Sequence, residues 1–421
     1  MNWKNMRRNS NFPEGFLLVL MLSLSLSARA QPLPGQRTSF GFINVNENVL
    51  QNDIALERFL EQLYQLKALD SGLVSVIHIG DSHIQADFLT EVVRKKLQST
   101  FGNAGRGLIV PGRVAGTNEP FNIRTSASGT WTSKRIVHPA NPLPIGIGGI
   151  TISTAEENGS LTMTMKESEV DYRFNRLTLF MPNDARSYSL SVMDSLSVEL
   201  TRYTSARGQD GSHAVKMPLP GLYRQVELRN VRESQEQSHT TLFGVNFENG
   251  RPGILYHAVG VNGARYEHYN KADMFALQTS LLKPNLVIIS LGTNESAEYP
   301  HLKTDFLRQV HTLVNAIRTN NPDAAVLLIT PPDAFLRKVK PNPGIEIIRR
   351  QILDYAVENG LAFWDMHKVG GGAGAAIHWR ESGLLRPDGI HFTREGYALQ
   401  GKLLYEAIMK SYTRYVGGRY P

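Results

Sequence analysis

Residues 73–85 read L-V-S-V-I-H-I-G-D-S-H-I-Q, an apolar run followed by glycine, small polar residues and the start of a helical pattern. The first seven residues are rich in Val and Ile and predict a short buried strand, Leu73–Ile79. From Ile84 to about Thr100 apolar residues recur at helical spacing, and Gly102 is well placed to end that helix. This order predicts an α/β protein with polar residues at the carboxyl end of a strand, where open parallel sheets bind their ligands.

The bulk composition is that of a globular protein with room for more than one folding unit. The chain has 421 residues, of which 41% are hydrophobic and 20% are charged. It contains no cysteine, which excludes disulfides, thiolate metal sites and a cysteine nucleophile. The formal net charge is +7, but the basic residues are scattered, so we expect no nucleic acid partner.

The first 30 residues differ from the rest of the chain. Positive charge at Lys4, Arg7 and Arg8 precedes an apolar block at residues 16–28, and small residues follow up to Ala30. This pattern predicts a secretory signal peptide over these 30 residues and a periplasmic or secreted mature protein. The block is shorter than the ~20 residues of a spanning helix, so we expect no stable membrane span after cleavage. An uncleaved N-terminal anchor stays the alternative.

The sequence changes character after about Val114. Residues 116–249 show little helical periodicity and many short strand-like runs, punctuated by turn signals such as Asn158-Gly159 and Asp210-Gly211. Closely spaced short strands of this kind predict a β-sandwich. The predicted strands are Gly149–Ser153, Leu161–Met165, Arg173–Met181, Tyr188–Met193, Ser197–Thr201, Tyr223–Leu228 and Thr240–Asn246.

Alternating strands and helices return after Gly253 and predict a parallel sheet covered on both faces. The predicted strands are Ile254–Val259, Leu286–Ser290, Ala325–Thr330 and Leu361–Trp364, and the main helices are Lys303–Thr319, Gly344–Asn359 and Arg394–Tyr412. Parallel neighbours normally need only a dozen or more connecting residues, far fewer than separate the first two strands here. We therefore predict one α/β domain, residues 31–115 and 250–421, interrupted by an all-β domain at 116–249.

Four polar clusters fall at strand ends or in loops that can reach them. They are Gly80-Asp81-Ser82-His83, Gly260-Val261-Asn262-Gly263, Gly292-Thr293-Asn294-Glu295 and Asp388-Gly389-Ile390-His391. Each cluster alone also has a structural interpretation. Ser82 with Gln85 fits a helix capping box, and the glycines permit tight turns. Asn294 is suited to bridging a loop, and Asp388 with its following glycine is a turn signal.

Together the clusters fit nucleophilic catalysis. A serine hydroxyl such as that of Ser82 becomes a nucleophile only when a base accepts its proton, and His391 is suited to that role. Asp388, three residues before His391, can fix the tautomer of the imidazole. An attacked ester develops an oxyanion that needs preorganised donors. The backbone N–H groups of Ser82 and Gly263 and the Asn294 amide are the candidates.

In this order the clusters resemble the sequence blocks of the SGNH (GDSL-type) hydrolase family, with His83 where that family more often has Leu. The resemblance covers about 31–115 and 250–421 and implies a flavodoxin-like three-layer fold. It implies that Ser82, Asp388 and His391 are catalytic and that Gly263 and Asn294 join Ser82 in the oxyanion hole. It implies neither a metal nor another cofactor.

The inserted β region, with Gly105-Arg106-Gly107-Leu108 before it, makes the chain similar to periplasmic peptidoglycan O-acetylesterases, whose inserted module resembles a carbohydrate-binding domain. The resemblance implies a serine esterase that removes O-acetyl groups from an acetylated cell-wall glycan. A carboxylic ester or lipid hydrolase and an O-acyltransferase with the same triad remain alternatives. The sequence does not indicate an oligomeric state.

Two alternatives come from other functional classes. In a metal-dependent phosphoesterase, Asp81, His83, Asn294, Asp388 and His391 would supply carboxylate, amide and imidazole ligands. That class is expected to have His after the Asn of the third cluster, where this chain has Glu, and it would leave the serine idle. A non-catalytic glycan-binding protein would use the sandwich alone, but the chain has every residue type of the triad.

Overall fold

The computed structural model describes residues 40–138, 144–205, 213–272 and 274–418, so the predicted signal peptide lies outside the described residues. The chain divides into the units Met1–Phe40 and Gly41–Pro421, and the second contains every element described below. Within the described ranges, no helix combines the length and the apolar character needed to cross a membrane.

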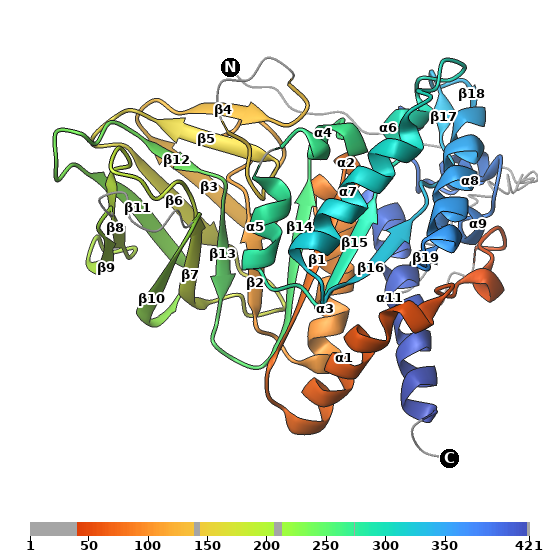
Figure 1. Ribbon diagram of the computed structural model, residues 1–421, viewed down its shortest axis with the longest axis horizontal. Helices are drawn as coiled ribbons and strands as arrows, with labels where there is room; N and C mark the ends of the chain where they lie inside the picture. Colours follow the sequence, from red (N-terminus) through yellow and green to blue (C-terminus); the bar gives the residue numbers. More distant parts are fainter. Residues whose placement is uncertain (1–39, 139–143, 206–212, 273, 419–421) are drawn as a thin grey trace, which may run out of the picture. The chain divides into compact units, whose positions relative to one another are not determined.

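A five-stranded parallel sheet forms the centre of the α/β part (Figure 1). Its strands, in spatial order, are β14 (Gly253–Gly260), β1 (Leu73–Gly80), β15 (Leu286–Ser290), β16 (Ala325–Ile329) and β19 (Ala362–Trp364). In chain order this arrangement is 2-1-3-4-5, the flavodoxin-like order, which confirms the predicted fold class. Gly80 lies in register with Gly260 and Ser290, so the carboxyl ends of three neighbouring strands are level.

Two groups of helices cover this sheet. One group contains α1 (Glu57–Leu69), α3 (Phe88–Phe101) and α11 (Arg394–Gly417), which contact one another. The other contains α4 (Tyr266–Asn270), α5 (Phe275–Leu281), α7 (Phe306–Asn320) and α8 (Pro343–Glu358). The shorter elements are the 3-10 helices η1 (Val45–Glu47) and η2 (Asp53–Leu56), the helices α2 (Ser82–Gln85), α6 (Thr293–Ser296), α9 (Met366–Val369) and α10 (Ala375–Glu381), and the hairpin strands β17 (Phe335–Leu336) and β18 (Lys340–Pro341).

Three antiparallel sheets form the β-rich part between β1 and β14. The first contains β10 (Ala214–Tyr223), β7 (Phe174–Phe180), β13 (Gly244–Glu248) and β2 (Gly105–Ile109). The second contains β3 (Ile123–Ser128), β6 (Ser160–Met165), β11 (Gln225–Val231), β8 (Ser189–Met193) and β9 (Glu199–Tyr203). The third contains β12 (Thr240–Leu242), β5 (Ile150–Thr154) and β4 (Thr132–Arg135).

The strand predicted at Thr240–Asn246 is wrong, because the chain changes sheets within it. It forms β12 and then β13, which belong to different sheets. The change takes place at Phe243, whose N–H donates to the carbonyl of Phe180, and at Gly244. A Cβ at Gly244 would lie 2.9 Å from Leu108 Cδ1, so glycine permits the close approach to β2 at this corner.

The β-rich part and the parallel sheet share one hydrophobic core. Ile77 and Ile79 of β1 belong to the same buried cluster as Phe174 of β7 and Phe247 of β13. Strand β2 also connects the two parts, because it pairs with β13 while Leu108 N–H donates to His257 Nδ1 of β14 at 3.0 Å. Folding of each part is therefore expected to depend on the other.

A buried ion-pair network forms where α2 passes into α3. The single helix predicted from Ile84 to Thr100 is interrupted here, because Asp87 has the left-handed φ of 62°. The Asp87 carboxylate does not cap α3 but binds the guanidinium groups of Arg94 in α3 and Arg106 in β2. All three side chains are 0–1% exposed, so water does not reach their charges. Each charge is therefore stabilised by the opposite charge beside it.

Candidate active site

The Ser82 turn lies at the carboxyl end of β1, in the middle of the parallel sheet. Gly80 ends the strand at a point where a Cβ would approach Ile84 Cγ1 to 2.3 Å, so the tight turn requires glycine. The capping-box interpretation of Ser82 is wrong, since the N-cap is Asp81, whose Oδ1 accepts from the N–H of His83 at 2.9 Å. Ser82 is instead the first residue of α2, and its hydroxyl forms a hydrogen bond with His391, which lies near the other end of the chain.

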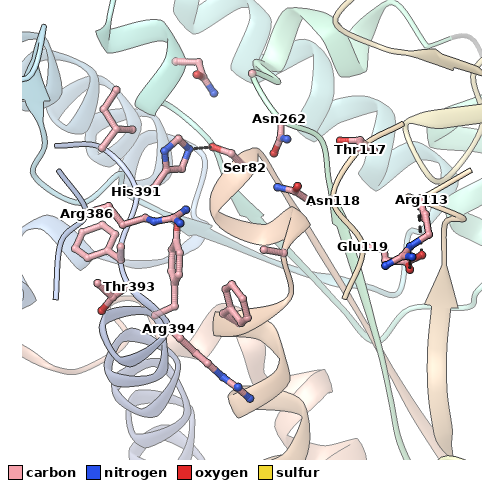
Figure 2. Close-up of a pocket in the computed structure, with 17 residues that line it drawn as sticks. Ser82, Arg113, Thr117, Asn118, Glu119, Asn262, Arg386, His391, Thr393 and Arg394 are labelled. Atoms are coloured by element: carbon pink, nitrogen blue, oxygen red, sulfur yellow. Dashed lines mark hydrogen bonds and ion pairs between the residues drawn. The ribbon is translucent and has the colours of Figure 1, made fainter. Parts of the chain in front are cut away.

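A continuous chain of hydrogen bonds joins Ser82, His391 and Asp388 (Figure 2 shows the first of them). Ser82 Oγ lies 2.8 Å from His391 Nε2, and His391 Nδ1 lies 3.1 Å from Asp388 Oδ2. The carboxylate is an acceptor, so Nδ1 carries the proton and Nε2 is left to accept from the serine. Partial burial works against ionisation of Asp388, but the N–H groups of His391 and Ile390 and the imidazole hold its pKa below the ordinary value.

Two unoccupied backbone donors lie beside Ser82. Among the hydrogen bonds of the described residues, none uses the N–H of Ser82 or of Gly263. Gly263 has φ +80°, and both residues line the same pocket. The third predicted donor, Asn294, also lines this pocket, but its amide nitrogen donates to Asp81 Oδ2 at 3.2 Å and to the Ala264 carbonyl at 3.0 Å. Asn294 must share or release one of these bonds to donate to an oxyanion.

Comparison with known proteins connects this geometry with a family. Residues 233–399 match the family model described as "GDSL-like Lipase/Acylhydrolase family". The chain carries a GDSL-like domain. The match includes Gly263, Asn294, Asp388 and His391 but begins after Ser82, because the β-rich part separates the nucleophile turn from the remainder of the domain. No match was found among proteins with curated descriptions.

One solved structure has the same fold over most of the chain. A structure described as "Peptidoglycan O-acetylesterase in action, 5 min" is similar over 89% of this chain and 100% of its own, with a TM-score of 0.72 and 23% identity. The GDSL-like domain therefore has the SGNH hydrolase fold, and the inserted β strands are part of the similarity. A lipase/acylhydrolase from Enterococcus faecalis matches 37% of this chain and 76% of its own, at 23% identity and a TM-score of 0.29. An acetylxylan esterase from Geobacillus stearothermophilus matches 38% and 73%, at 19% identity and a TM-score of 0.29.

Gln85 connects the Ser82 turn to both neighbouring loops. Its Oε1 accepts from the N–H of Asn262 at 2.6 Å, next to the candidate donor Gly263. Its Nε2 donates to Thr117 Oγ1 at 2.7 Å and to the Asn118 carbonyl at 3.1 Å. This role was not predicted from the sequence, because the partners of a buried amide are not readable from its spacing.

His83 lies against the triad as a positioning residue. Its Nδ1 lies 2.8 Å from Asp81 Oδ1 and its Nε2 lies 3.2 Å from the Ile390 carbonyl. Both partners are acceptors, so His83 donates from both nitrogens and is an imidazolium. Burial lowers the pKa of His83, but Asp81, the Ile390 carbonyl and Asp388 together raise it above the ordinary value. His83 also stacks on His391 with ring centroids 5.7 Å apart, and it holds the backbone just before the base.

A pocket of about 960 Å³ opens beside Ser82 and His391 (Figure 2). One side is formed by residues 113–119, which lead into β3 and include Arg113 and Glu119. The opposite side is formed by residues from 386–397, which include His391 and the start of α11. The volume is that of a site for a small molecule or a short segment of a polymer.

Glu295 is a buried carboxyl behind the GDSL-like site. Its Oε1 accepts from the N–H of Tyr266 at 2.9 Å, while its Oε2 is buried without a partner. Burial raises the pKa of Glu295 to about 7, and the nearby charge of Asp81 acts in the same direction. In the folded protein this side chain therefore exchanges its proton near neutral pH.

Glu295→Gln is expected to stabilise the protein above pH 7 and to have little effect near pH 4. Between its ordinary pKa of 4.5 and about 7, the folded chain holds a proton that the unfolded chain has released. The free energy of unfolding of the wild type therefore falls as the pH rises through this window, by up to ~3 kcal/mol, whereas the glutamine variant lacks this loss. Urea unfolding of both proteins at pH 4.5, 6 and 8 tests this. A stability difference that does not grow with pH would contradict it.

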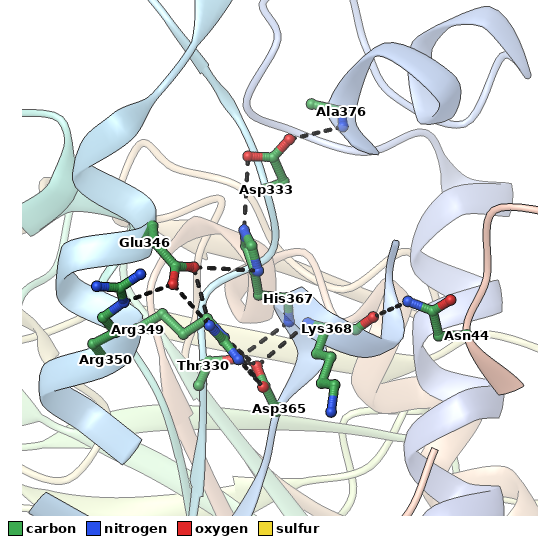
Figure 3. Close-up of polar contacts among 10 residues, drawn as sticks. All are labelled: Asn44, Thr330, Asp333, Glu346, Arg349, Arg350, Asp365, His367, Lys368 and Ala376. Atoms are coloured by element: carbon green, nitrogen blue, oxygen red, sulfur yellow. Dashed lines mark hydrogen bonds and ion pairs between the residues drawn. The ribbon is translucent and has the colours of Figure 1, made fainter. Parts of the chain in front are cut away.

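A second polar cluster lies beyond the ends of β16 and β19 (Figure 3). Arg349 Nη2 binds Asp365 Oδ2 at 2.6 Å, and Asp365 caps α9. Asp333 Oδ2 accepts from the N–H of Ala376 at 2.9 Å, and its Oδ1 lies 3.9 Å from His367 Nε2. Burial lowers the pKa of His367 and raises that of Asp333, so it favours the neutral form of both.

Asp333 of this cluster lies close in sequence to a residue that contacts the turn carrying Asp388 and His391. Two residues after Asp333, the N–H of Phe335 donates to the Gly389 carbonyl at 2.8 Å, between Asp388 and Ile390. A Cβ at Gly389 would lie 2.8 Å from Phe335 Cβ, so the contact requires glycine. Among the residues that the structure describes, no group of three or more His, Asp and Glu side chains is arranged to hold a metal ion.

Proposed function

We propose that the protein is a serine esterase that removes O-acetyl groups from a cell-wall glycan, with peptidoglycan as the substrate. The observation that carries the proposal is the hydrogen-bonded chain Ser82–His391–Asp388 at the open pocket. The GDSL-like domain supports acyl-ester chemistry. The similarity to a peptidoglycan O-acetylesterase over 89% of the chain and the predicted export signal support the substrate class and a periplasmic or secreted location.

The first half of the proposed reaction forms an acyl-enzyme. His391 Nε2 accepts the hydroxyl proton of Ser82 as its Oγ attacks the acetyl carbonyl. Asp388 keeps the imidazole in the required tautomer and stabilises the imidazolium that forms. The N–H groups of Ser82 and Gly263 stabilise the oxyanion, joined by the Asn294 amide if it releases an internal bond. His391 then protonates the leaving sugar oxygen.

The second half releases acetate. Water enters from the pocket, His391 accepts one of its protons, and the resulting hydroxide attacks the acetyl group on Ser82. The tetrahedral intermediate uses the same N–H donors and collapses as His391 returns the proton to Ser82 Oγ. Each step moves protons only among the ester, water, Ser82 and His391. This proposed route uses neither a metal ion nor an organic cofactor.

Acetate release from matched substrates tests the proposed function. Purified protein is expected to release acetate from O-acetylated peptidoglycan and to release none from the same material after mild alkaline de-acetylation. A long-chain acyl ester serves as the comparison for lipid hydrolysis, and an added acceptor sugar reveals acetyl transfer. Turnover of the long-chain ester but not of the acetylated glycan would overturn the substrate assignment. Acetylated acceptor in place of free acetate would identify a transferase.

A further inference from the structure

The pocket beside Ser82 contains two cations without a charged partner. Four of its lining residues are arginine or glutamate. Arg113 and Glu119 form an ion pair with Nε and Oε1 3.4 Å apart, so their charges offset each other. The side chains of Arg386 and Arg394 are exposed and make no ion pair or hydrogen bond with any described residue. The lining as a whole therefore carries an uncompensated positive charge.

Both cations are held by the loop that carries the catalytic base. The N–H of Arg386 donates to the His391 carbonyl at 2.8 Å, and the N–H of Thr393 donates to the Leu384 carbonyl at 2.8 Å, which closes the loop. Thr393 caps α11 and thereby fixes Arg394 as the first helical residue. In Figure 2 the Arg386 side chain extends beside His391 toward the open pocket.

Arg394 is fixed further by aromatic contacts. Its guanidinium lies 4.2 Å from the ring centroid of Phe121 and 5.8 Å from that of Phe88. Phe88 stacks on both Phe121 and Tyr397, with centroids 6.1 and 6.3 Å apart. A guanidinium held flat on a ring keeps its edge N–H groups available to an acceptor. Phe88 and Tyr397 line the pocket too, so the aromatic residues that contact Arg394 belong to the same pocket as His391.

We propose that Arg386 and Arg394 each bind an acidic group of the glycan along this side of the pocket, Arg386 beside His391 and Arg394 farther from it at the start of α11. This inference rests on the proposed function and adds to it a preference for acidic over neutral glycans. Guanidinium groups pair with carboxylates in two-point geometry, and unpaired charge of one sign in a concave site raises the local concentration of ligands of the other. The carboxylate has two possible sources in peptidoglycan, namely the sugar and the stem peptide.

The test compares kcat/KM for an acidic and a neutral acetylated polymer, O-acetylated peptidoglycan and acetylated xylan. Arg386→Gln and Arg394→Gln are each expected to lower kcat/KM on peptidoglycan roughly fivefold more than on xylan, the size expected for one exposed charge pair. Arg386→Lys keeps the charge and is expected to restore most of this preference. Raising the salt concentration is expected to reduce the preference of the wild type for the acidic polymer but not that of the double variant.

Arg318→Gln is the control, because this arginine in α7 is exposed, forms no ion pair among the described residues and does not line the pocket. Its ratio of kcat/KM between the two polymers is expected to stay that of the wild type. Digestion with an amidase, which removes the peptides and frees the sugar carboxylate, distinguishes the two sources. A larger Arg386→Gln effect after digestion assigns the contact of Arg386 to the sugar carboxylate, and a smaller one assigns it to the peptide.

The outcomes separate this inference from the proposed function. If peptidoglycan is deacetylated and both glutamine variants leave the ratio between the polymers unchanged, the role proposed for the two arginines is wrong and the esterase stands. The same holds if Arg318→Gln changes the ratio as much as they do. If acetylated peptidoglycan releases no acetate while a small acetyl ester is hydrolysed, the proposed substrate fails first.

Discussion

Ser82→Ala is expected to reduce turnover of a small acetyl ester by at least ~10⁴-fold without changing the thermal stability of the protein. The hydroxyl makes one hydrogen bond, to His391 Nε2 at 2.8 Å, and it lies at the pocket, so its removal leaves no buried group unpaired. The N–H donors of Ser82 and Gly263 remain, so a weak residual activity above the uncatalysed rate is expected. Initial rates with 4-nitrophenyl acetate and melting curves of both proteins measure the two effects.

Ser280→Ala is the control for this experiment. It removes an exposed hydroxyl in α5 that donates to the Leu277 carbonyl, and it should keep the full rate. The assay is repeated with a chelator, which is expected to change neither protein's rate. Activity that persists in Ser82→Ala and disappears on chelation would overturn the serine mechanism in favour of metal-dependent hydrolysis.

Asp87→Ala is expected to lower the free energy of unfolding by ~3–5 kcal/mol. The substitution leaves Arg94 and Arg106 buried next to each other with no carboxylate between them, at 0% and 1% exposure. Burial and the charge of Arg94 lower the pKa of Arg106 to about 10, while the Asp87 carboxylate acts in the opposite direction and favours the charged guanidinium. Because Arg94 lies in α3 and Arg106 in β2, both parts of the protein should unfold together at a lower urea concentration.

Asp323→Ala provides the matched comparison. Asp323 pairs with Arg58 on the surface, where the two side chains are 89% and 72% exposed. Loss of such a pair costs less than ~1 kcal/mol, because water solvates the arginine that remains. Equal destabilisation by the two substitutions would contradict the role assigned to the buried network.

The parallel sheet is the part of the fold that the sequence predicts best, because its strands are buried on both faces and appear as continuous apolar runs. The strand predicted at Leu286–Ser290 has the same bounds in the structure. Strands β2, β3, β4 and β10 were missed. Strand β2 contains two glycines within five residues, and β10 contains Pro218 and Pro220. Both β2 and β10 are strands because of the partners they meet in the folded chain, which local composition does not show.

For the active site, too, the sequence pointed to some of the residues and missed others. The residue types of the triad, their placement at strand ends or in nearby loops, and the resemblance to the SGNH hydrolase family pointed to Ser82, Asp388 and His391, and the structure places them within hydrogen-bond distance. Arg386 and Arg394 were not predicted. Arginine is common on surfaces, and only the folded pocket shows which guanidinium groups lack a carboxylate. Glu295 was noted as part of a block, but its raised pKa depends on burial that spacing does not show.

The order of the strands has a consequence for the newly synthesised chain. Strand β1, which leads to Ser82, lies between β14 and β15, and both are made much later. The base His391 follows the nucleophile by 309 residues, and α11 must pack on α3 to complete the fold. A ribosome-bound chain therefore displays its serine long before it has a base or the Gly263 N–H. The proposed triad therefore cannot form until nearly the whole chain has been made.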